Sequence, residues 1–229
     1  MKRPYIVCHM MTSVDGRIDC AMTEQLPGVE DYYRTLDALQ TPTTVSGRVT
    51  AELEMALPGT FAAAQAHPLG REAFSKAADA AGYEIVADTA GKLLWPDASG
   101  MEKPYLILTS ERVSEEYLDY LDGRHISWIA AGEERVDLAR AARILAEHFS
   151  VSRMAVVGGA QINTAFLEAG LLDEVSILVG AGIDGRGGMP ALFDGRAEGS
   201  PVLSLRLESA QAFESGAVWL RYRTRGARG

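Results

Sequence analysis

The stretch MAVVGGAQINTAFLEAGLLDE, residues 154–174, decides the fold of this chain. It opens with four apolar residues, which predict a short buried strand. Gly158 and Gly159 follow at once. A helix is predicted next, because apolar residues recur at three- and four-residue steps: Ile162, Ala165, Phe166 and Ala169. Gly170 is expected to end this helix in the left-handed conformation, and a second strand is predicted at 174–179.

A strand, two glycines and a helix N-terminus form a pattern that can bind an anion. Glycines let a phosphate approach the backbone, and the amides of the first helical turn have no partners within the helix. The same pattern also makes a plain tight turn, so both interpretations stay open. The Rossmann fingerprint G-x-G-x-x-G is absent from the chain. Our working hypothesis is a ligand that carries phosphate.

The composition limits the class of protein. With 229 residues, 47% of them hydrophobic, the chain is predicted to form a single domain over residues 1–229. A net charge of −9 makes nucleic acid and anionic membranes poor partners. The apolar runs are far shorter than the ~20 residues of a membrane span. Cys8 and Cys20 have no metal-binding or redox spacing, so we expect no metal site and a reduced, cytoplasmic location.

The order of the predicted elements indicates the fold class. Strands and helices alternate over residues 104–170, which predicts a parallel sheet with crossover helices. An earlier hairpin is predicted from residues 84–87 and 92–95, and residues 202–213 and 217–224 predict a C-terminal antiparallel hairpin. We therefore expect an α/β fold with a mostly parallel central sheet, flanked by helices and closed by this hairpin.

Two turns that follow predicted strands carry polar side chains. In the first, Ser13 and Asp15 suit contacts to a substrate, because ligands of open α/β sheets bind at the carboxyl ends of the strands. Asp15-Gly16 is also a common turn signal, so a structural role stays open. In the second turn, Thr50 could cap a helix predicted over residues 50–57.

Three segments resemble motifs of one family, the dihydrofolate-reductase-like RibD C-terminal family. Residues 12–18, TSVDGRI, resemble its S-[LV]-D-G-[KR]-I element, and residues 46–50, SGRVT, are similar to its vGrgT element. Residues 157–163 with 170–174 resemble its EGGgtLn…aGLvDE segment. The order and spacing match along nearly the whole chain apart from residues 58–103.

The resemblance implies a dihydrofolate-reductase-like fold and an oxidoreductase that uses NADPH as hydride donor. The implied substrate is a small molecule of the pyrimidine or pterin type. In riboflavin biosynthesis, the family reduces a phosphoribosylamino-pyrimidine whose ribose opens to an imine-like form. A nucleotide-binding module that kept the pocket and lost turnover is the alternative. Members often form dimers, and the apolar C-terminal strands could pair across a two-fold axis, although a monomer stays possible.

The resemblance also assigns roles to individual residues. The implied ligands of the cofactor pyrophosphate are Gly158, Gly159, Ala160 and Gln161. The implied residues elsewhere along the cofactor are Thr50, Glu54, Thr109, Ser110 and Arg112. The implied substrate contacts are Ser13, Asp15 and Arg48, with Asp15 as a catalytic proton relay or a polar anchor. Arg112 has the charge and fork geometry to bind a 2′-phosphate, which favours NADPH over NADH.

The chain departs from the family pattern at three points. Val157 replaces the usual glutamate before the glycines, and Glu54 stands where an aspartate is common. The family's basic segment that helps to hold the substrate phosphate is missing, since Arg34 is the only basic residue within residues 31–40. Because of these departures, the resemblance supports the reductase class more strongly than it supports any particular substrate. The binding-module alternative also stays open.

Overall fold

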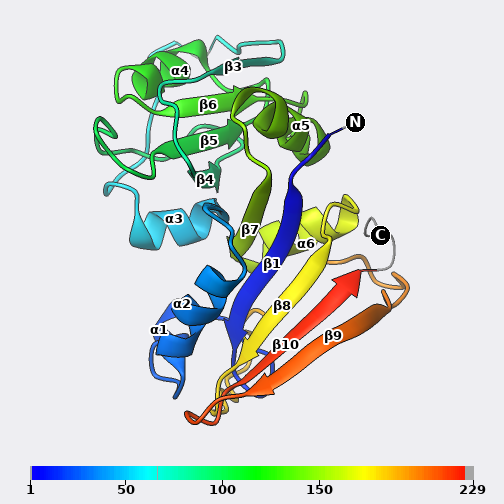
Figure 1. Ribbon diagram of the computed structural model, residues 1–229. Coiled ribbons are helices and arrows are strands. Elements are labelled where there is room, and N and C mark those ends of the chain that lie inside the picture. Colours follow the sequence, from blue (N-terminus) through cyan, green and yellow to red (C-terminus); the bar gives the residue numbers. More distant parts are fainter. Residues whose placement is uncertain (1, 66, 225–229) are drawn as a thin grey trace. The chain divides into compact units, whose positions relative to one another are not determined.

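The computed structural model describes residues 2–65 and 67–224 (Figure 1). Contacts divide the chain into two compact units. The first unit is Pro42–Met154 with a short N-terminal piece, and the second is Tyr5–Thr41 with the residues from Ala155 onward. The predicted single domain over residues 1–229 stays a prediction. No helix in the described ranges is long and apolar enough to cross a membrane.

The first unit is an α/β layer with strand order β3-β6-β5-β4-β2. Its strands are β2 (Thr43–Gly47), β3 (Ala73–Ser75), β4 (Glu84–Ala87), β5 (Tyr105–Thr109) and β6 (Ser127–Ala130). Its helices are α3 (Arg48–Glu54), α4 (Glu115–Asp122) and α5 (Leu138–His148). The pairs β2–β4, β4–β5 and β5–β6 are parallel, and only the pairing of β3 with β6 is antiparallel among the register pairs of this unit. The alternation over residues 104–170 therefore predicted the parallel sheet correctly.

Local sequence signals explain where the longer helices of this unit begin. Ser114 is the N-cap of α4, and its hydroxyl accepts a hydrogen bond from the backbone N–H of Tyr117 at 3.2 Å. Asp137 caps α5 in the same way through the N–H of Arg140 at 2.9 Å. Helix α4 then buries Tyr117, Leu118 and Leu121 in a core cluster that also contains Val86 and Ile107.

The prediction of a hairpin from residues 84–87 and 92–95 is wrong. Strand β4 pairs in parallel with β2 and β5, and residues 92–95 form no strand. The reason is the buried carboxylate of Asp88, whose Oδ2 accepts hydrogen bonds from the backbone N–H groups of Lys92 and Leu93 at 2.6 and 2.8 Å. The same oxygen accepts the Tyr117 hydroxyl of α4 at 3.1 Å, so the turn is held into the core and not extended as a strand.

The second unit has strand order β7-β1-β8-β10-β9. Its strands are β1 (Tyr5–Thr12), β7 (Arg153–Gly158), β8 (Glu174–Val179), β9 (Leu205–Ala212) and β10 (Val218–Thr224). Its helices are α1 (Cys20–Thr23), α2 (Val29–Ala38) and α6 (Ala160–Glu168). Strands β1 and β8 are parallel, whereas β10 is antiparallel to both β8 and β9. The C-terminal hairpin is thereby confirmed.

His9 occupies a buried polar position between β1 and α2. Its Nδ1 lies 2.9 Å from the Ser176 hydroxyl, and its Nε2 lies 3.2 Å from the Thr35 hydroxyl. The ring of Tyr32 stacks on the imidazole at 4.8 Å with an interplanar angle of 10°. Burial lowers the pKa of His9 to about 4, because a charged imidazolium loses its hydration there.

This burial makes the stability of the protein depend on pH. The folded-state pKa lies below the unfolded value, so stability is fully present above about pH 6.5 and is lost as pH falls towards 4. His9→Gln removes this titration. Chemical unfolding at pH 7 and 4.5 should show that the wild type loses about 2 kcal/mol more than the variant over this range. An equal pH dependence in the two proteins would contradict a buried neutral His9.

Candidate functional site

The glycine pair lies where the sequence predicted it, between β7 and α6 in the second unit. Gly158 ends β7, and Gly159 is the N-cap of α6. The backbone angles of Gly159, φ 83° and ψ 129°, lie in a region that residues other than glycine rarely adopt. No side-chain cap to the first turn is found in the part of the chain that the structure describes, and that turn contains no acidic residue. The N-terminus of α6 therefore presents backbone N–H groups and the positive end of its dipole to an anion.

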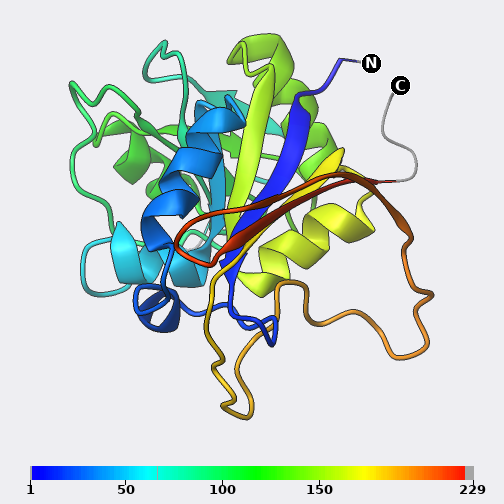
Figure 2. The same cartoon turned by 60° about the horizontal axis from the view of Figure 1, so that its bottom comes forward.

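A long connection, residues 180–204, passes α6 and is hydrogen-bonded to it in its middle part (Figure 2). The Asn163 side-chain amide donates to the carbonyl of Leu192 at 2.9 Å, and the Thr164 hydroxyl accepts from the backbone N–H of Asp194 at 2.9 Å. Asn163 is fully buried, yet its Oδ1 has no hydrogen-bond partner within the described residues. A buried acceptor in this state is available to a water molecule or a ligand.

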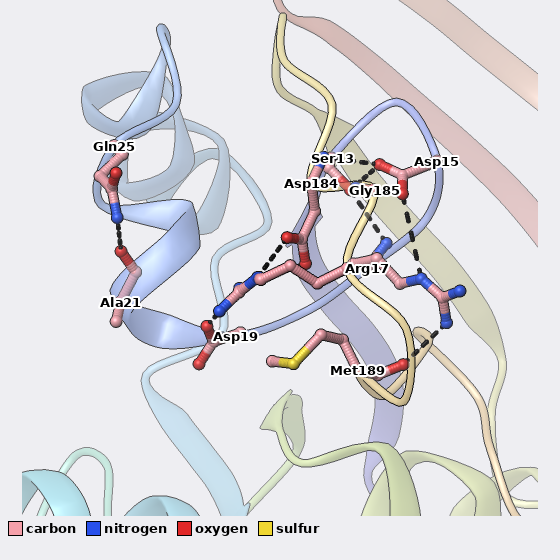
Figure 3. A network of polar contacts seen from close by, with 10 residues as sticks. Ser13, Asp15, Arg17, Asp19, Ala21, Gln25, Asp184, Gly185 and Met189 are labelled. Atoms are coloured by element: carbon pink, nitrogen blue, oxygen red, sulfur yellow. Dashed lines mark hydrogen bonds and ion pairs between the residues drawn. The ribbon is translucent and has the colours of Figure 1, made fainter.

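Asp15 fastens the start of the same connection (Figure 3). Its Oδ1 accepts hydrogen bonds from the Ser13 hydroxyl at 2.7 Å and from the Asp184 N–H at 3.0 Å, and its Oδ2 accepts from the Gly185 N–H at 3.0 Å. The bond from Ser13, followed by the two backbone bonds, lowers the pKa of Asp15 to about 2. The carboxylate is therefore ionised at neutral pH. These contacts describe a polar anchor, and the catalytic role of Asp15 as a proton relay stays a prediction.

Two arginines that the sequence analysis did not single out join this network, and Figure 3 labels one of them, Arg17. Arg17 donates from Nη1 to the carbonyl of Met189 at 2.7 Å, and its Nε lies 3.9 Å from the Asp15 carboxylate. Arg186 forms ion pairs with Asp184 and, at 2.9 Å, with Asp19. The Asp-Gly-Arg sequence and the glycine-rich segment 180–188 were the available signals, but their contact could not be read from either segment alone.

Helix α3 of the first unit carries three of the expected site residues. Thr50 does not cap this helix, because the helix begins at Arg48 and Gly47 is its N-cap. The capping interpretation is therefore wrong, and Thr50 lies half-buried in the first turn. Arg48 is paired with Glu52 at 2.9 Å on the exposed side, and Glu54 is exposed at the end of the helix.

The carboxyl ends of three neighbouring parallel strands in the first unit carry buried polar groups. They lie at the ends of β2, β4 and β5, and the atoms without a hydrogen-bond partner among the described residues are Ser46 Oγ, Asp88 Oδ1 and Thr109 Oγ1. Each of these residues is at most 1% exposed. Ser110, which follows Thr109, donates to the carbonyl of Thr89 at 3.0 Å. At this edge of the first unit, these buried oxygen atoms can therefore still form hydrogen bonds with a ligand or water.

Arg112 lies farther along the loop that follows β5. Its side chain is 67% exposed and forms an ion pair with Glu134 from the loop that follows β6. The expected site residues thus fall into two groups: Arg48, Thr50, Glu54, Thr109, Ser110 and Arg112 lie in the first unit, whereas Ser13, Asp15, Gly158, Gly159, Ala160 and Gln161 lie in the second. In the second unit, the connection 180–204 contacts both the Asp15 loop and α6.

Comparison with known proteins gives one family match and several similar structures. The model of the RibD C-terminal domain matches residues 4–219. A relative from Methanothermobacter thermautotrophicus, 2,5-diamino-6-ribosylamino-4(3H)-pyrimidinone 5′-phosphate reductase, is 25% identical over 228 residues, with 93% of this chain and 94% of the relative covered.

Two solved structures show the same fold. A pyrimidine reductase-like protein from Corynebacterium diphtheriae matches with a TM-score of 0.72 and 16% identity, over 97% of this chain and 92% of its own. The Saccharomyces cerevisiae riboflavin biosynthesis reductase Rib7 matches with a TM-score of 0.61 and 18% identity, over 97% of this chain and 90% of its own. The expected dihydrofolate-reductase-like type of fold is confirmed by these neighbours.

The anchoring role of Asp15 can be measured directly. In Asp15→Asn, the amide keeps one neutral acceptor oxygen, so one of the two backbone N–H groups of residues 184 and 185 loses its acceptor and the other bond weakens. Amide hydrogen exchange in peptides covering 182–189 should become faster. Asp194→Asn, the same change elsewhere in the connection, should leave these peptides unchanged. Unaltered exchange in Asp15→Asn would show that the carboxylate does not hold the loop.

Proposed function

We propose that this chain, which belongs to the RibD C-terminal domain family, is an NADPH-dependent reductase of a phosphoribosylamino-pyrimidine or a related pyrimidine or pterin. The observation that carries the proposal is the uncapped N-terminus of α6 behind the Gly158–Gly159 pair. The similarity to a pyrimidinone phosphate reductase over 94% of its length supports the substrate class. The two cysteines form no disulfide, which suits a reaction in the cytoplasm.

The residues present fit a dinucleotide. The backbone N–H groups at the start of α6, with Gly158, Gly159, Ala160 and Gln161, would hold the pyrophosphate. In the first unit, the unpartnered buried oxygens at the ends of β2, β4 and β5 are a separate set of polar atoms available to a ligand. When bound, NADPH supplies the hydride. The protein binds and orients both reactants and excludes water.

The substrate side would be built by the Asp15 network. Reduction of an imine-like carbon places a hydride on carbon and a proton on nitrogen. The pKa of Asp15, about 2, keeps the carboxylate ionised near neutral pH, which favours its role as a polar anchor, and its role as a proton relay stays the alternative. Ser13 already donates its hydroxyl to Asp15. Arg48 of the first unit stays a proposed substrate contact, and its guanidinium is paired with Glu52.

A nucleotide-binding module without turnover is the second candidate. Val157 in place of a glutamate and the missing basic segment favour it. Spectrophotometric NADPH oxidation with a ribosylamino-pyrimidine 5′-phosphate separates the two. We expect NADPH consumption that requires the pyrimidine. Binding of NADPH without consumption would support the module, and no binding of NADPH or NADH would refute the reductase.

The anion role of α6 predicts the effect of a single charge. Gln161→Glu adds a carboxylate of nearly the same shape to the first turn, where it suits the helix dipole but repels a pyrophosphate. NADPH affinity, measured by calorimetry, should fall at least about tenfold while the melting temperature stays equal or rises. Gln211→Glu on the exposed strand β9 is the matched control. If Gln161→Glu binds NADPH as tightly as the wild type, the proposal that α6 binds the pyrophosphate is wrong.

We also propose a homodimer formed through the C-terminal hairpin. Cross-strand pairs place Leu207 opposite Tyr222, and the side chains that share this face of the hairpin are Leu205, Leu207, Ala210, Ala212, Val218, Leu220 and Tyr222. Leu205 and Leu207 are 37% and 53% exposed. The other face contains Trp219, which packs in the core cluster with Met11 and Leu178. An exposed aliphatic sheet face of this kind fits a second copy of the chain.

Leu207→Lys tests this dimer. A lysine in the middle of the apolar face should convert a dimer into a monomer in sedimentation equilibrium, because its charge would be buried without a partner. Gln211→Lys, on the opposite face of the same strand, should remain dimeric. A monomeric wild-type protein at micromolar concentration would contradict the proposal.

A further inference from the structure

The loops that follow β5 and β6 leave the sheet side by side. The two strands are parallel, and Thr109 at the end of β5 pairs with Ala130 at the end of β6. Beyond them, the Glu111 N–H donates to the carbonyl of Gly132 at 2.8 Å, and the Gly132 N–H donates to the Glu111 carboxylate at 3.2 Å. These two bonds hold the loops together, so the positions of the residues that follow are coupled.

Arg112 and Glu134 face each other across these two loops. The guanidinium Nη2 forms an ion pair with the Glu134 carboxylate, and the side chains are 67% and 62% exposed. Glu111 and Glu133 stand beside them, and Arg135 follows. The segments 111–112 and 133–135 thus contain three carboxylates and two arginines. The positive charge of Arg112 is therefore already balanced by a neighbouring carboxylate.

The geometry points to Glu134 as a specificity-determining residue that competes with the cofactor 2′-phosphate for Arg112. This inference rests on the proposed function, in which Arg112 binds that phosphate. NADPH differs from NADH only by this group. Glu134 already pairs with Nη2 of Arg112, so a phosphate can reach that N–H group only by displacing the carboxylate. This cost falls on NADPH alone. The wild-type protein should therefore bind NADPH less than about tenfold more tightly than NADH.

Removing the competing carboxylate should raise NADPH affinity selectively. In Glu134→Gln, calorimetric titration should show NADPH binding about threefold to tenfold more tightly, with NADH unchanged. The gain should shrink as salt is raised, because exposed charges are screened. Glu102→Gln is the matched control: it removes one exposed carboxylate from the segment before β5, at the opposite end of that strand, and should leave both affinities unchanged.

A double-mutant cycle assigns the effect to the ion pair. Arg112→Gln should lower NADPH affinity to the level of NADH, and Glu134→Gln should then have no further effect in that background. A gain that persists without Arg112, or one that is equal for NADPH and NADH, overturns the role of Glu134. Unchanged NADPH affinity in Glu134→Gln also overturns it but leaves the reductase proposal intact. If neither cofactor binds the wild type, the reductase proposal fails, and this inference fails with it.

Discussion

The start of the connection 180–204 is held by the bonding of the Asp15 carboxylate to the backbone of Asp184 and Gly185, together with the bond from the Val14 N–H to the carbonyl of Gly182. Residues 180–204 contain no helix or strand, so their backbone groups need partners from elsewhere. Asp15 supplies two of these partners at one end, and Asn163 and Thr164 of α6 supply others farther along. The connection therefore joins the loop after β1 to the helix that begins at the glycine pair. A charged acceptor suits this task, because bonds to a carboxylate are stronger than bonds to a neutral group.

The first unit uses its polar groups differently. Asp88 is buried and satisfies three donors through one oxygen, from Lys92, Leu93 and Tyr117, while its other oxygen stays unpartnered within the described part of the chain. The hydroxyls of Ser46 and Thr109 are in the same state at the neighbouring strand ends. Buried polar atoms without partners cost stability. Their gathering at the carboxyl ends of adjacent parallel strands is understandable when a ligand or water completes their bonding, and this is the edge at which open α/β sheets bind ligands.

Local patterns made much of the fold predictable. Apolar periodicity and the two glycines located α6 and its flanking strands, and β8 has the predicted bounds Glu174–Val179. The Thr50 cap failed for a local reason, because α3 begins at Arg48, whereas the failed hairpin depended on contacts distant in sequence. The expected hairpin near residue 90 is replaced by a turn whose carboxylate, Asp88, bonds a tyrosine 29 positions away. The candidate site followed the same rule: a motif named Asp15 and the family resemblance named Arg112, but their partners Asp184 and Glu134 lie on other loops and belong to no motif.

Charge decides how such a protein can hold a phosphate. The net charge is −9, and four arginines of the candidate loops already face carboxylates: Arg17, Arg48, Arg112 and Arg186. At each of them a carboxylate competes with an incoming anion for the guanidinium, and an exposed exchange of this kind gains little free energy. Backbone amides have no such competitor at the start of α6, where no side-chain cap is found within the described residues. Under the proposed function, the binding of a pyrophosphate would therefore rest on amide dipoles, and the arginines would act on selectivity more than on affinity.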